Sequence, residues 1–468
     1  MRIERDMLGA HPVPDDAYYG VHTARALENF PIARRPIHPA LVRALAEVKK
    51  AAALTNREIG ALDPKIADAI VRAADEVLGG ALLGQFPVDE MQGGAGTSAN
   101  MNVNEVLANR AIELMGGQKG GYTLIHPLDH VNLHQSTNDV FPTAVRIAAI
   151  RLLKPVSERL AQLQTALQEK EEAFSDVLKV GRTQLQDAVP VTLGQEFGAW
   201  AQAVARDRWR LYKAEERLRQ VPIGGTAVGT CANAPRAYVF GMIEKLRSLT
   251  GLGLARAEYM TDATQNADVF VEVSGLLKAA AVSLSKIASD MRLLASGPRG
   301  SIGEILLPAV QAGSSIMPGK VNPVICEAVN QVAFQVMAND LAVTLAAQSG
   351  QLELNAFLPL IARNLFEMLD MTERVLGLFI ERCVHGIEAD RDACRRNLES
   401  GYTLAVALTG SIGYDRASEV ASECRRTGRT VREVVLEKGL MDEKALDALL
   451  RPQRLTAPSS GKEERGWT

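Results

Sequence analysis

Residues 313–323 combine two hydroxyls, a cation and an amide with several turn-forming residues. The run GSSIMPGKVNP supplies the hydroxyls of Ser314 and Ser315, the ammonium of Lys320 and the amide of Asn322. Glycine permits backbone angles that other residues resist and proline fixes its own φ, so this segment is irregular but specified. Such a loop can hold an anionic substrate beside a general base. On these local features alone, a surface turn is the alternative.

The residues after this loop predict a helix. No glycine or proline occurs from Val324 to Gln348, and Asn322 and Pro323 are residue types that favour the N-cap and the first helical position. An anion held by the loop would therefore feel both the Lys320 ammonium and the positive end of the helix dipole.

Three other blocks combine hydroxyl and amide side chains with turn or cap residues. They are GGAGTSANMN at 93–102, QSTND at 135–139 and GRTQLQDAVP at 181–190. Taken singly, the first is a candidate hinge, the second a helix cap and the third a capped turn. In this order, and with the loop at 313–323, they resemble the conserved blocks of the aspartase/fumarase superfamily. Its members eliminate ammonia, an amine or water from a succinyl skeleton, and the resemblance covers nearly the whole chain.

Two features distinguish the branches of that superfamily. The opening RIERD at 2–6, with AYYGVHT at 17–23, is similar to the aspartases rather than to the class II fumarases. Thr137 and Gln184 stand where fumarases usually carry Ser and His, and both resemble aspartases. The resemblance implies a carbon–nitrogen lyase that reversibly deaminates L-aspartate to fumarate and ammonia, by anti elimination through an enediolate.

Other readings stay open. Class II fumarase, which interconverts malate and fumarate, is the closest alternative. A catalytically silent relative, like the lens crystallins of the superfamily, would need losses in the catalytic blocks, which are present here. Argininosuccinate and adenylosuccinate lyases share the fold, but their larger substrates go with different N-terminal and middle blocks.

The expected reaction explains why these groups would converge. The C3 proton of aspartate is very weakly acidic, so the enediolate dianion needs several preorganised hydrogen-bond donors. By resemblance, Ser314 is the general base, and a serine needs help in that role from backbone N–H groups, Lys320 or the helix end. The matching substrate-binding positions are Thr97, Ser136, Thr137 and Ser315 for the side-chain carboxylate, Lys320, Asn322, Thr183 and Gln184 for the α-carboxylate, and Asn138 with Ser136 and Thr137 around the amino group.

The histidines near residue 130 raise the question of a metal. His126, His130 and His134 recur every four residues beside Asp129, a spacing that on one helix would form a metal-binding face. Pro127 interrupts this spacing, and the expected elimination needs no redox or hydrolytic ion. No metal site and no cofactor are therefore predicted, and activation by Mg²⁺, a property of some relatives, is not predicted from the sequence.

The same region departs from the family. His126-Pro127 with Asp129 resembles the superfamily's secondary carboxylate-binding turn, but Leu128 stands where Asn is usual and Leu133-His134 where Lys and a small residue are common. These departures weaken the case for a secondary anion site. A further departure is CANA at 231–234, where relatives carry Gly and Thr.

Composition excludes several classes of protein. The chain has 468 residues, 47% apolar and 23% charged, the balance of a globular protein with more than one domain. A net charge of −3 without a long basic run argues against nucleic-acid and anionic-membrane surfaces. Five widely spaced cysteines without a Cys-x-x-Cys pair read as reduced thiols. The charged N-terminus and the lack of a long apolar stretch predict neither a signal peptide nor a membrane span, so a cytoplasmic location is expected.

Helical periodicity dominates the elements that must position these residues. From 268 to 294, apolar residues alternate steps of four and three, as in a coiled-coil seam. From 197 to 218, they recur every seven residues. The helix after Pro323 mixes apolar and uncharged polar residues on several faces, which suggests burial among several helices from one or more subunits. Strand-like alternation is scarce, so a mainly all-α protein is expected.

The predicted organisation has three parts. Residues 1–140 form an N-terminal domain, 141–395 a central bundle of long helices, and 396–468 a small C-terminal domain whose last stretch, from 457 onward, is a tail without core-forming residues. The resemblance implies the same three-domain layout. It also implies a homotetramer in which each active site, binding a small dicarboxylate, draws on three subunits.

Overall fold

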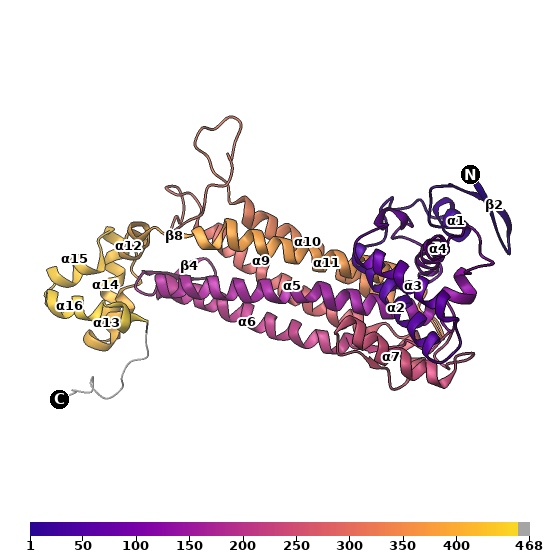
Figure 1. Ribbon diagram of the computed structural model, residues 1–468. Coiled ribbons are helices and arrows are strands. Elements are labelled where there is room, and N and C mark those ends of the chain that lie inside the picture. The colour runs from indigo at the N-terminus through magenta and orange to yellow at the C-terminus, as the bar shows by residue number, and fades with distance from the viewer. Residues whose placement is uncertain (457–468) are drawn as a thin grey trace. The chain divides into compact units, whose positions relative to one another are not determined.

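The computed structural model describes residues 1–456, and these are mainly helical (Figure 1). This confirms the predicted fold class. The predicted tail from 457 onward lies outside the described residues. The principal helices are α1 (Val21–Asn29), α2 (Pro39–Glu58), α3 (Pro64–Leu78), α4 (Thr97–Leu114), α5 (Thr137–Ala173), α6 (Leu193–Leu218), α7 (Arg236–Thr250), α8 (Met260–Gln265), α9 (Asp268–Leu294), α10 (Val324–Gln348), α11 (Leu358–Arg382), α12 (Arg391–Glu399), α13 (Ala405–Ile412), α14 (Tyr414–Thr427), α15 (Val431–Glu437), α16 (Glu443–Leu449) and α17 (Pro452–Leu455).

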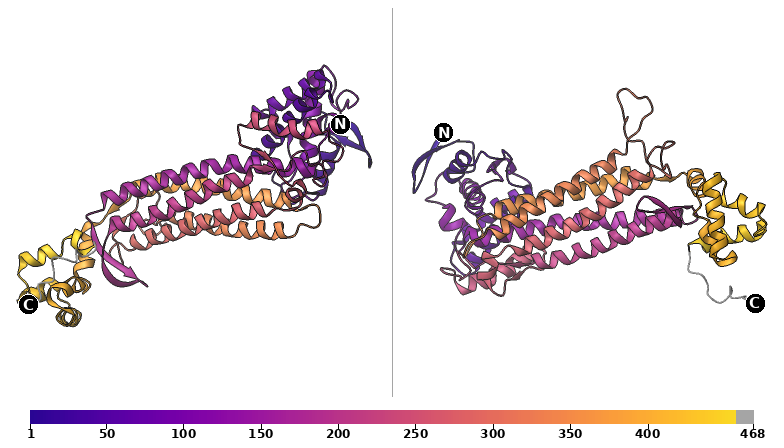
Figure 2. Two further views of the ribbon diagram at one scale, coloured as in Figure 1. Left: turned by 90° about the horizontal axis from the view of Figure 1, so that it is seen from below. Right: turned by 180° about the vertical axis from the view of Figure 1, so that it is seen from behind.

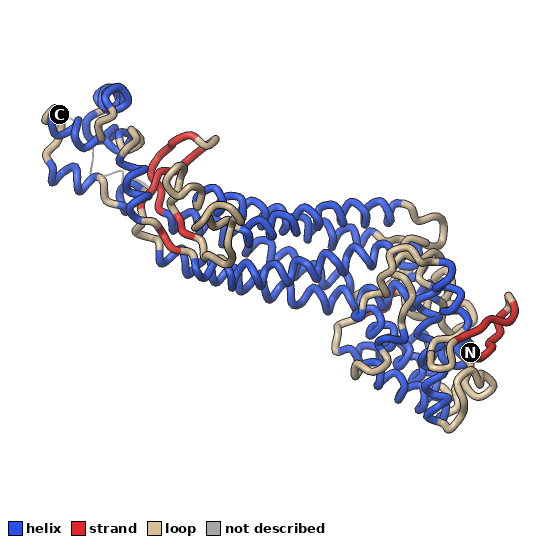
Figure 3. The backbone as a smooth tube through the Cα atoms, turned by 90° about the horizontal axis from the view of Figure 1, so that it is seen from above, coloured by secondary structure: helices blue, strands red, loops and turns tan. Residues whose placement is uncertain are grey.

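The strands of the described chain form only two-stranded sheets (Figure 3). Three pairs are antiparallel and one, β5 with β6, is parallel. The pairs are β1 (Arg2–Asp6) with β2 (Gly9–Val13), β3 (Leu178–Thr183) with β4 (Gln186–Thr192), β5 (Gln220–Val221) with β6 (Ala255–Arg256), and β7 (Ile305–Leu306) with β8 (Glu388–Ala389). Sheets this small cannot form the core, so helix packing must do so.

The described chain forms two compact units. Unit 1 comprises 1–157, 209–281 and 334–373, and unit 2 comprises 158–208, 282–333 and the described residues from 374 onward. Within each unit, segments of the five long helices α5, α6, α9, α10 and α11 run side by side (Figure 2). The predicted boundaries of three domains, at residues 140 and 395, stay a prediction. The two units are defined by contacts within the chain and do not test those boundaries.

The two apolar seams are buried along their whole length. Residues at the seam of α9 are at most 6% exposed, and the seven-residue repeat of α6 is fully buried. The buried residues thus follow the helical period that the sequence predicts. The seam residues are Val273, Leu277, Ala280, Leu284, Ile287, Met291 and Leu294 on α9, and Phe197, Val204, Leu211 and Leu218 on α6.

Helix α5 runs through two prolines. Pro142 and Pro155 both lie inside it. A proline lacks the N–H that bonds to the carbonyl four residues back, so each of these two positions costs α5 one backbone hydrogen bond. Pro142 is the sixth residue of α5, counting from Thr137, and the helix continues past it.

Helix α10 has one buried and one exposed apolar face. Val329 and Val336 are 1% exposed, whereas Phe334, Leu341 and Leu345 are 59, 60 and 50% exposed. Within the single chain, the predicted burial of α10 therefore holds for the face that carries Val329 and Val336 and does not hold for the face that carries Phe334, Leu341 and Leu345. Among the described residues, no helix is long and apolar enough to cross a lipid bilayer.

Candidate active site

The glycine block of unit 1 ends in the first turn of α4. Gly96 precedes the helix with φ of 93°, and a Cβ there would lie 2.4 Å from the Phe141 ring, so only glycine fits. Thr97 is the first residue of α4, and its hydroxyl donates to the Gly94 carbonyl at 2.8 Å. Its side chain is exposed and stands at the positive end of the helix.

A network of side-chain amides joins this block to Ser136, Thr137 and Asn138. Asn100 Nδ2 donates to Thr137 Oγ1 at 3.0 Å and to Asn132 Oδ1 at 3.3 Å. The same Asn132 oxygen accepts from Lys49 Nζ at 2.8 Å. The structure thus brings the Thr97 and Ser136–Asn138 blocks together within unit 1.

Lys49 lies beneath these blocks and is completely buried. Its ammonium also donates to Gln135 Oε1 at 3.0 Å. Burial lowers the pKa of Lys49 to about 7, although the negative charge of Asp139 acts to raise it. Sequence reasoning missed Lys49, although the spacing of Val42, Leu45 and Ala52 would have placed it on the buried face of α2.

Asp139 anchors the start of α5 from the same side. It accepts the N–H of Ser136 at 3.0 Å and those of Gly224 and Thr226 at 3.1 and 3.0 Å. Burial raises the pKa of Asp139 to about 7, although these N–H groups and Lys49 favour its charged form. Asn138 is fixed nearby, because its amide donates to the Ala227 carbonyl at 2.7 Å.

The histidines do not share one face. The His126 ring accepts the N–H groups of Leu128 and Asp129, both at 3.2 Å, and so caps the short π-helical turn Pro127–Val131. His130 Nδ1 accepts the His126 N–H at 2.8 Å, while His134 contacts Asn56 Oδ1 at 2.8 Å. Within residues 1–456, no group of three or more His, Cys, Asp or Glu side chains is arranged to hold a metal ion.

In unit 2, Thr183 and Gln184 lie at the tip of the β3–β4 hairpin. Gln184 and Leu185 form the turn, with φ of 55° and 61°, a left-handed pair typical of tight hairpins. Both predicted binding residues are exposed. The hairpin is held from inside by Arg182, whose guanidinium donates twice to the buried Glu304, at 2.9 Å for each bond.

The loop at 313–323 is closed on itself. Gly313 N–H donates to the Lys320 carbonyl at 2.7 Å, and Asn322 Nδ2 donates to the Gly313 carbonyl at 2.8 Å. A Cβ on Gly313 would lie 2.5 Å from the Lys320 carbonyl oxygen, which explains the glycine. Helix α10 begins at Val324. The predicted N-cap, Asn322, instead uses its side-chain amide to close the loop.

Ser314 sits in this loop as a hydrogen-bond acceptor. Its Oγ accepts the N–H groups of Ile316 at 3.2 Å and Met317 at 3.0 Å. Two donors aimed at one hydroxyl oxygen favour its deprotonated form. Ser315 and Lys320 are exposed beside it, so the loop can present a proton acceptor, a hydroxyl and a cation to a small anion.

The predicted site residues therefore fall into three groups. Thr97 and Ser136–Asn138 belong to unit 1, joined by the amide network. Thr183 and Gln184 stand on the hairpin of unit 2, and Ser314, Ser315, Lys320 and Asn322 on its loop, each with its own supports. Sequence reasoning also missed Glu304, and no local pattern marks it out.

Comparisons with known proteins agree with these blocks. Residues 9–338 match a family described as Lyase, and residues 404–457 match one described as Fumarase C C-terminus. An aspartate ammonia-lyase from a Bacillus species is 48% identical, over 98% of this chain and 98% of that protein. Those from Escherichia coli K12 and Pseudomonas canavaninivorans are 47% and 49% identical, over 98% of this chain and 97% of each protein.

Solved structures show the same fold. The Brucella melitensis fumarate lyase:delta crystallin bound to cobalt has a TM-score of 0.95 and 50% identity, over 98% of this chain and 100% of that one. The class II fumarase of Schistosoma mansoni has a TM-score of 0.93 and 35% identity, over 98% of this chain and 99% of that one. The chain therefore belongs to the aspartase/fumarase superfamily and, within it, to the aspartate ammonia-lyase family.

Proposed function

We propose that this chain catalyses the reversible elimination of ammonia from L-aspartate to give fumarate, as a carbon–nitrogen lyase. The carrying observation is near-full-length identity of 46 to 49% to aspartate ammonia-lyases. The chain retains the hydroxyl, amide and cationic groups of all four blocks. The identity to aspartate ammonia-lyases and these groups together point to aspartate as the substrate, which the fold alone would not identify.

In the proposed mechanism, Ser314 Oγ takes the C3 proton of aspartate. The C–H electron pair moves into the side-chain carboxylate as an enediolate, and its return forms the C2–C3 double bond as ammonia leaves C2. The N–H groups of Ile316 and Met317 support Ser314 as a base, since they stabilise its alkoxide. The Ser314 proton then passes to solvent, and reversal of these steps adds ammonia to fumarate.

Substrate binding is assigned to the remaining groups. Hydroxyls of Thr97, Ser136, Thr137 and Ser315 stabilise the enediolate, because hydrogen bonds that strengthen in the transition state accelerate the reaction. Lys320 supplies the charge for the α-carboxylate, assisted by neutral donors. Those donors are Asn322, Thr183 and Gln184, and Asn138 lies with Ser136 and Thr137 around the amino group.

Fumarase activity is the competing proposal, since a class II fumarase has the same fold. Incubation of the purified protein with L-aspartate or L-malate, followed by ultraviolet absorbance of fumarate, separates the two. We expect much faster fumarate formation from aspartate, and consumption of fumarate when ammonia is added. Faster turnover of malate would contradict the assignment.

The active form is proposed to be a homotetramer with shared active sites. Phe334, Leu341 and Leu345 form an exposed apolar stripe on α10, spaced by seven and four residues. Exposed apolar side chains gathered on one helix face are typical of protein–protein interfaces. Thr183 and Ser314 stand on two different segments, the β3–β4 hairpin and the loop before α10, which fits sites completed by neighbouring subunits.

The reaction is proposed to need no cofactor, because proton transfer and expulsion of ammonia require only groups that the chain carries. Dialysis against a chelator should leave aspartate turnover intact. A cytoplasmic location is proposed from the five cysteines, none of which is paired in a disulfide in the described chain.

A further inference from the structure

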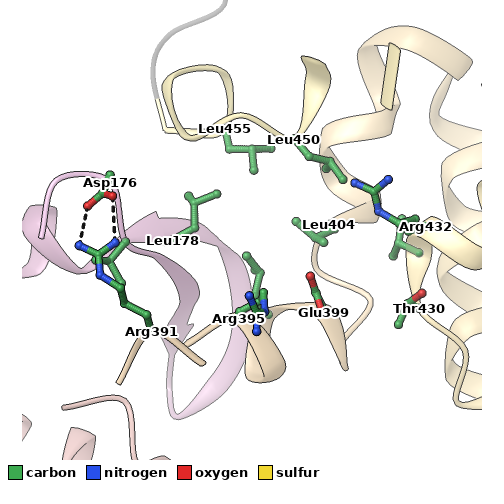
Figure 4. A pocket seen from close by; sticks show the side chains of 13 residues that line it. Asp176, Leu178, Arg391, Arg395, Glu399, Leu404, Thr430, Arg432, Leu450 and Leu455 are labelled. Carbon is green, nitrogen blue, oxygen red and sulfur yellow. Dashed lines mark hydrogen bonds and ion pairs between the residues drawn. The ribbon is translucent and has the colours of Figure 1, made fainter. Parts of the chain in front are cut away.

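A cavity of about 400 Å³ lies in unit 2, and no residue of the 313–323 loop or of the hairpin tip lines it (Figure 4). Its walls come from the connection between α5 and β3 and from helices α12, α15, α16 and α17 with their adjoining turns. This volume lies in the range of small-molecule sites. The lining residues are Asp176, Val177, Leu178, Arg391, Arg395, Leu398, Glu399, Leu404, Thr430, Val431, Arg432, Leu450 and Leu455.

The floor of this cavity is apolar. Leu398, Leu404 and Val431 are buried there and belong to the hydrophobic cluster of the C-terminal helices. Figure 4 shows Leu404 between Arg395 and Arg432 in that view, with Leu450 and Leu455 on one side of the space. A ligand in this space would therefore meet both aliphatic side chains and guanidinium groups.

The three arginines of the rim differ in how firmly they are held. Arg391 forms a bidentate pair with Asp176, at 2.9 and 3.0 Å, so its charge is matched within the wall. Arg395 pairs with Asp392 at 2.8 Å, but these side chains are 65 and 70% exposed. Exposed pairs of this kind are weak and exchange partners readily.

Arg432 is also available to a ligand. Its side chain is 41% exposed and pairs with Asp447 and Glu443, which are absent from the cavity lining. Arginine binds carboxylate and phosphate through its planar fork of donors. Asp176 neutralises the charge of Arg391, so Glu399 is the remaining carboxylate of the lining. The positive charges of Arg395 and Arg432 outnumber its single negative charge.

We propose that this cavity binds an organic anion with an aliphatic body, whose acidic group meets Arg395 and Arg432 while its chain lies on Leu398, Leu404 and Leu450. This site is independent of the proposed lyase activity, since none of the expected catalytic residues lines it. Glu399 sets a limit on affinity, because its charge opposes that of the ligand.

The test titrates decanoate, a linear monocarboxylate, into the full-length protein by calorimetry, below the concentration at which decanoate aggregates. Decyltrimethylammonium, which has the same aliphatic chain and the opposite charge, is the matched ligand control. We expect saturable binding of one decanoate per chain and much weaker binding of the cation. Absence of saturable decanoate binding, or equal binding of both ligands, would overturn the proposal.

Variants assign the binding to this cavity. Arg395→Gln and Arg432→Gln should each weaken decanoate binding by roughly fivefold to tenfold, as loss of a partly exposed charge-assisted hydrogen bond predicts. Glu399→Gln should strengthen it roughly twofold to fivefold, because a like charge is removed. Leu450→Trp should abolish binding by filling the space while leaving the rim charges in place.

Two controls guard against general effects. Arg416→Gln removes an exposed arginine of α14 outside the cavity lining and should leave affinity unchanged. Thermal unfolding of every variant should match the wild type, which shows that the C-terminal helices are folded. If decanoate binds all variants as it binds the wild type, the ligand occupies another surface and the proposal fails.

Discussion

Glu304 and Arg182 form a bidentate ion pair across 122 residues of sequence, with both bonds at 2.9 Å. Glu304 is fully buried, forms an ion pair with Lys179 at 3.1 Å and accepts a hydrogen bond from Asn397 at 3.0 Å. Burial opposes ionisation of Glu304, but the Arg182 bond and the Lys179 charge outweigh it, so its pKa lies below the ordinary value. One carboxylate therefore joins the Thr183 hairpin to the segment that leads into the Ser314 loop.

Glu304→Gln should raise KM for aspartate and destabilise the protein. Glutamine cannot accept from both nitrogens of Arg182 and from Lys179, and breaking a buried ion pair costs about 3–5 kcal/mol. Steady-state kinetics and chemical unfolding measure the two effects. Glu272→Gln, in the exposed pair with Arg217, is the control and should change stability by less than about 1 kcal/mol. An unchanged KM would show that Glu304 does not position Thr183.

Ser314→Ala should reduce kcat by several powers of ten while nearly preserving the affinity for a succinate-like inhibitor. Ser315 and Lys320 remain to hold the carboxylates, so the lost group acts mainly in proton removal. Lys320→Ala should instead weaken inhibitor binding as well. Equal losses of inhibitor affinity in both variants would assign Ser314 to binding rather than to catalysis.

Lys49→Met should give a pH-dependent loss of stability. The folded pKa of Lys49, about 7, lies below its unfolded value of about 10.4, so the folded state binds fewer protons between these values. The stability that Lys49 contributes is thus present above about pH 10 and is lost as pH falls through 7. Removing the Lys49 charge also raises the pKa of Asp139 further. The variant therefore loses additional stability as pH rises, which widens its difference from the wild type.

The difference in unfolding free energy between wild type and Lys49→Met should therefore grow as pH rises from about 7 to about 10. Urea unfolding at several pH values measures it. Lys50→Met, which removes the neighbouring ammonium paired with Asp75 at 2.5 Å, should show no such trend. A difference that shrinks with rising pH would mean that Lys49 is charged in the folded state throughout.

Thr183→Ala and Ser314→Ala should complement each other in mixed oligomers. Each is expected to be nearly inactive alone. When the two are unfolded and reassembled together, some sites will receive an intact Thr183 from one chain and an intact Ser314 from another, and activity should return to a sizeable fraction of wild type. Co-purification of differently tagged subunits verifies that hybrids form. Inactive hybrids would place both residues in one subunit and remove the shared-site proposal.

The sequence by itself determined the features that depend on neighbours along the chain. The steps of three and four in α9 and the seven-residue repeat of α6 predicted their buried faces, because helix geometry alone decides which residues share a face. The start and end of α10 followed from Pro323 and from the absence of glycine and proline before residue 349. The four blocks, in their order, carry the resemblance to the aspartase/fumarase superfamily.

Only the tertiary structure decided which side chains meet. Lys49 and Asn132 are 83 residues apart, and no local pattern pairs them. Asn322 is a residue type favoured at an N-cap, yet only the structure shows that its side-chain amide donates to the Gly313 carbonyl. Glu304 acquires its role only because packing buries it beside Arg182 and Lys179, where an unpaired charge would be costly. Such pairings depend on how distant segments pack, which residue type and spacing do not encode locally.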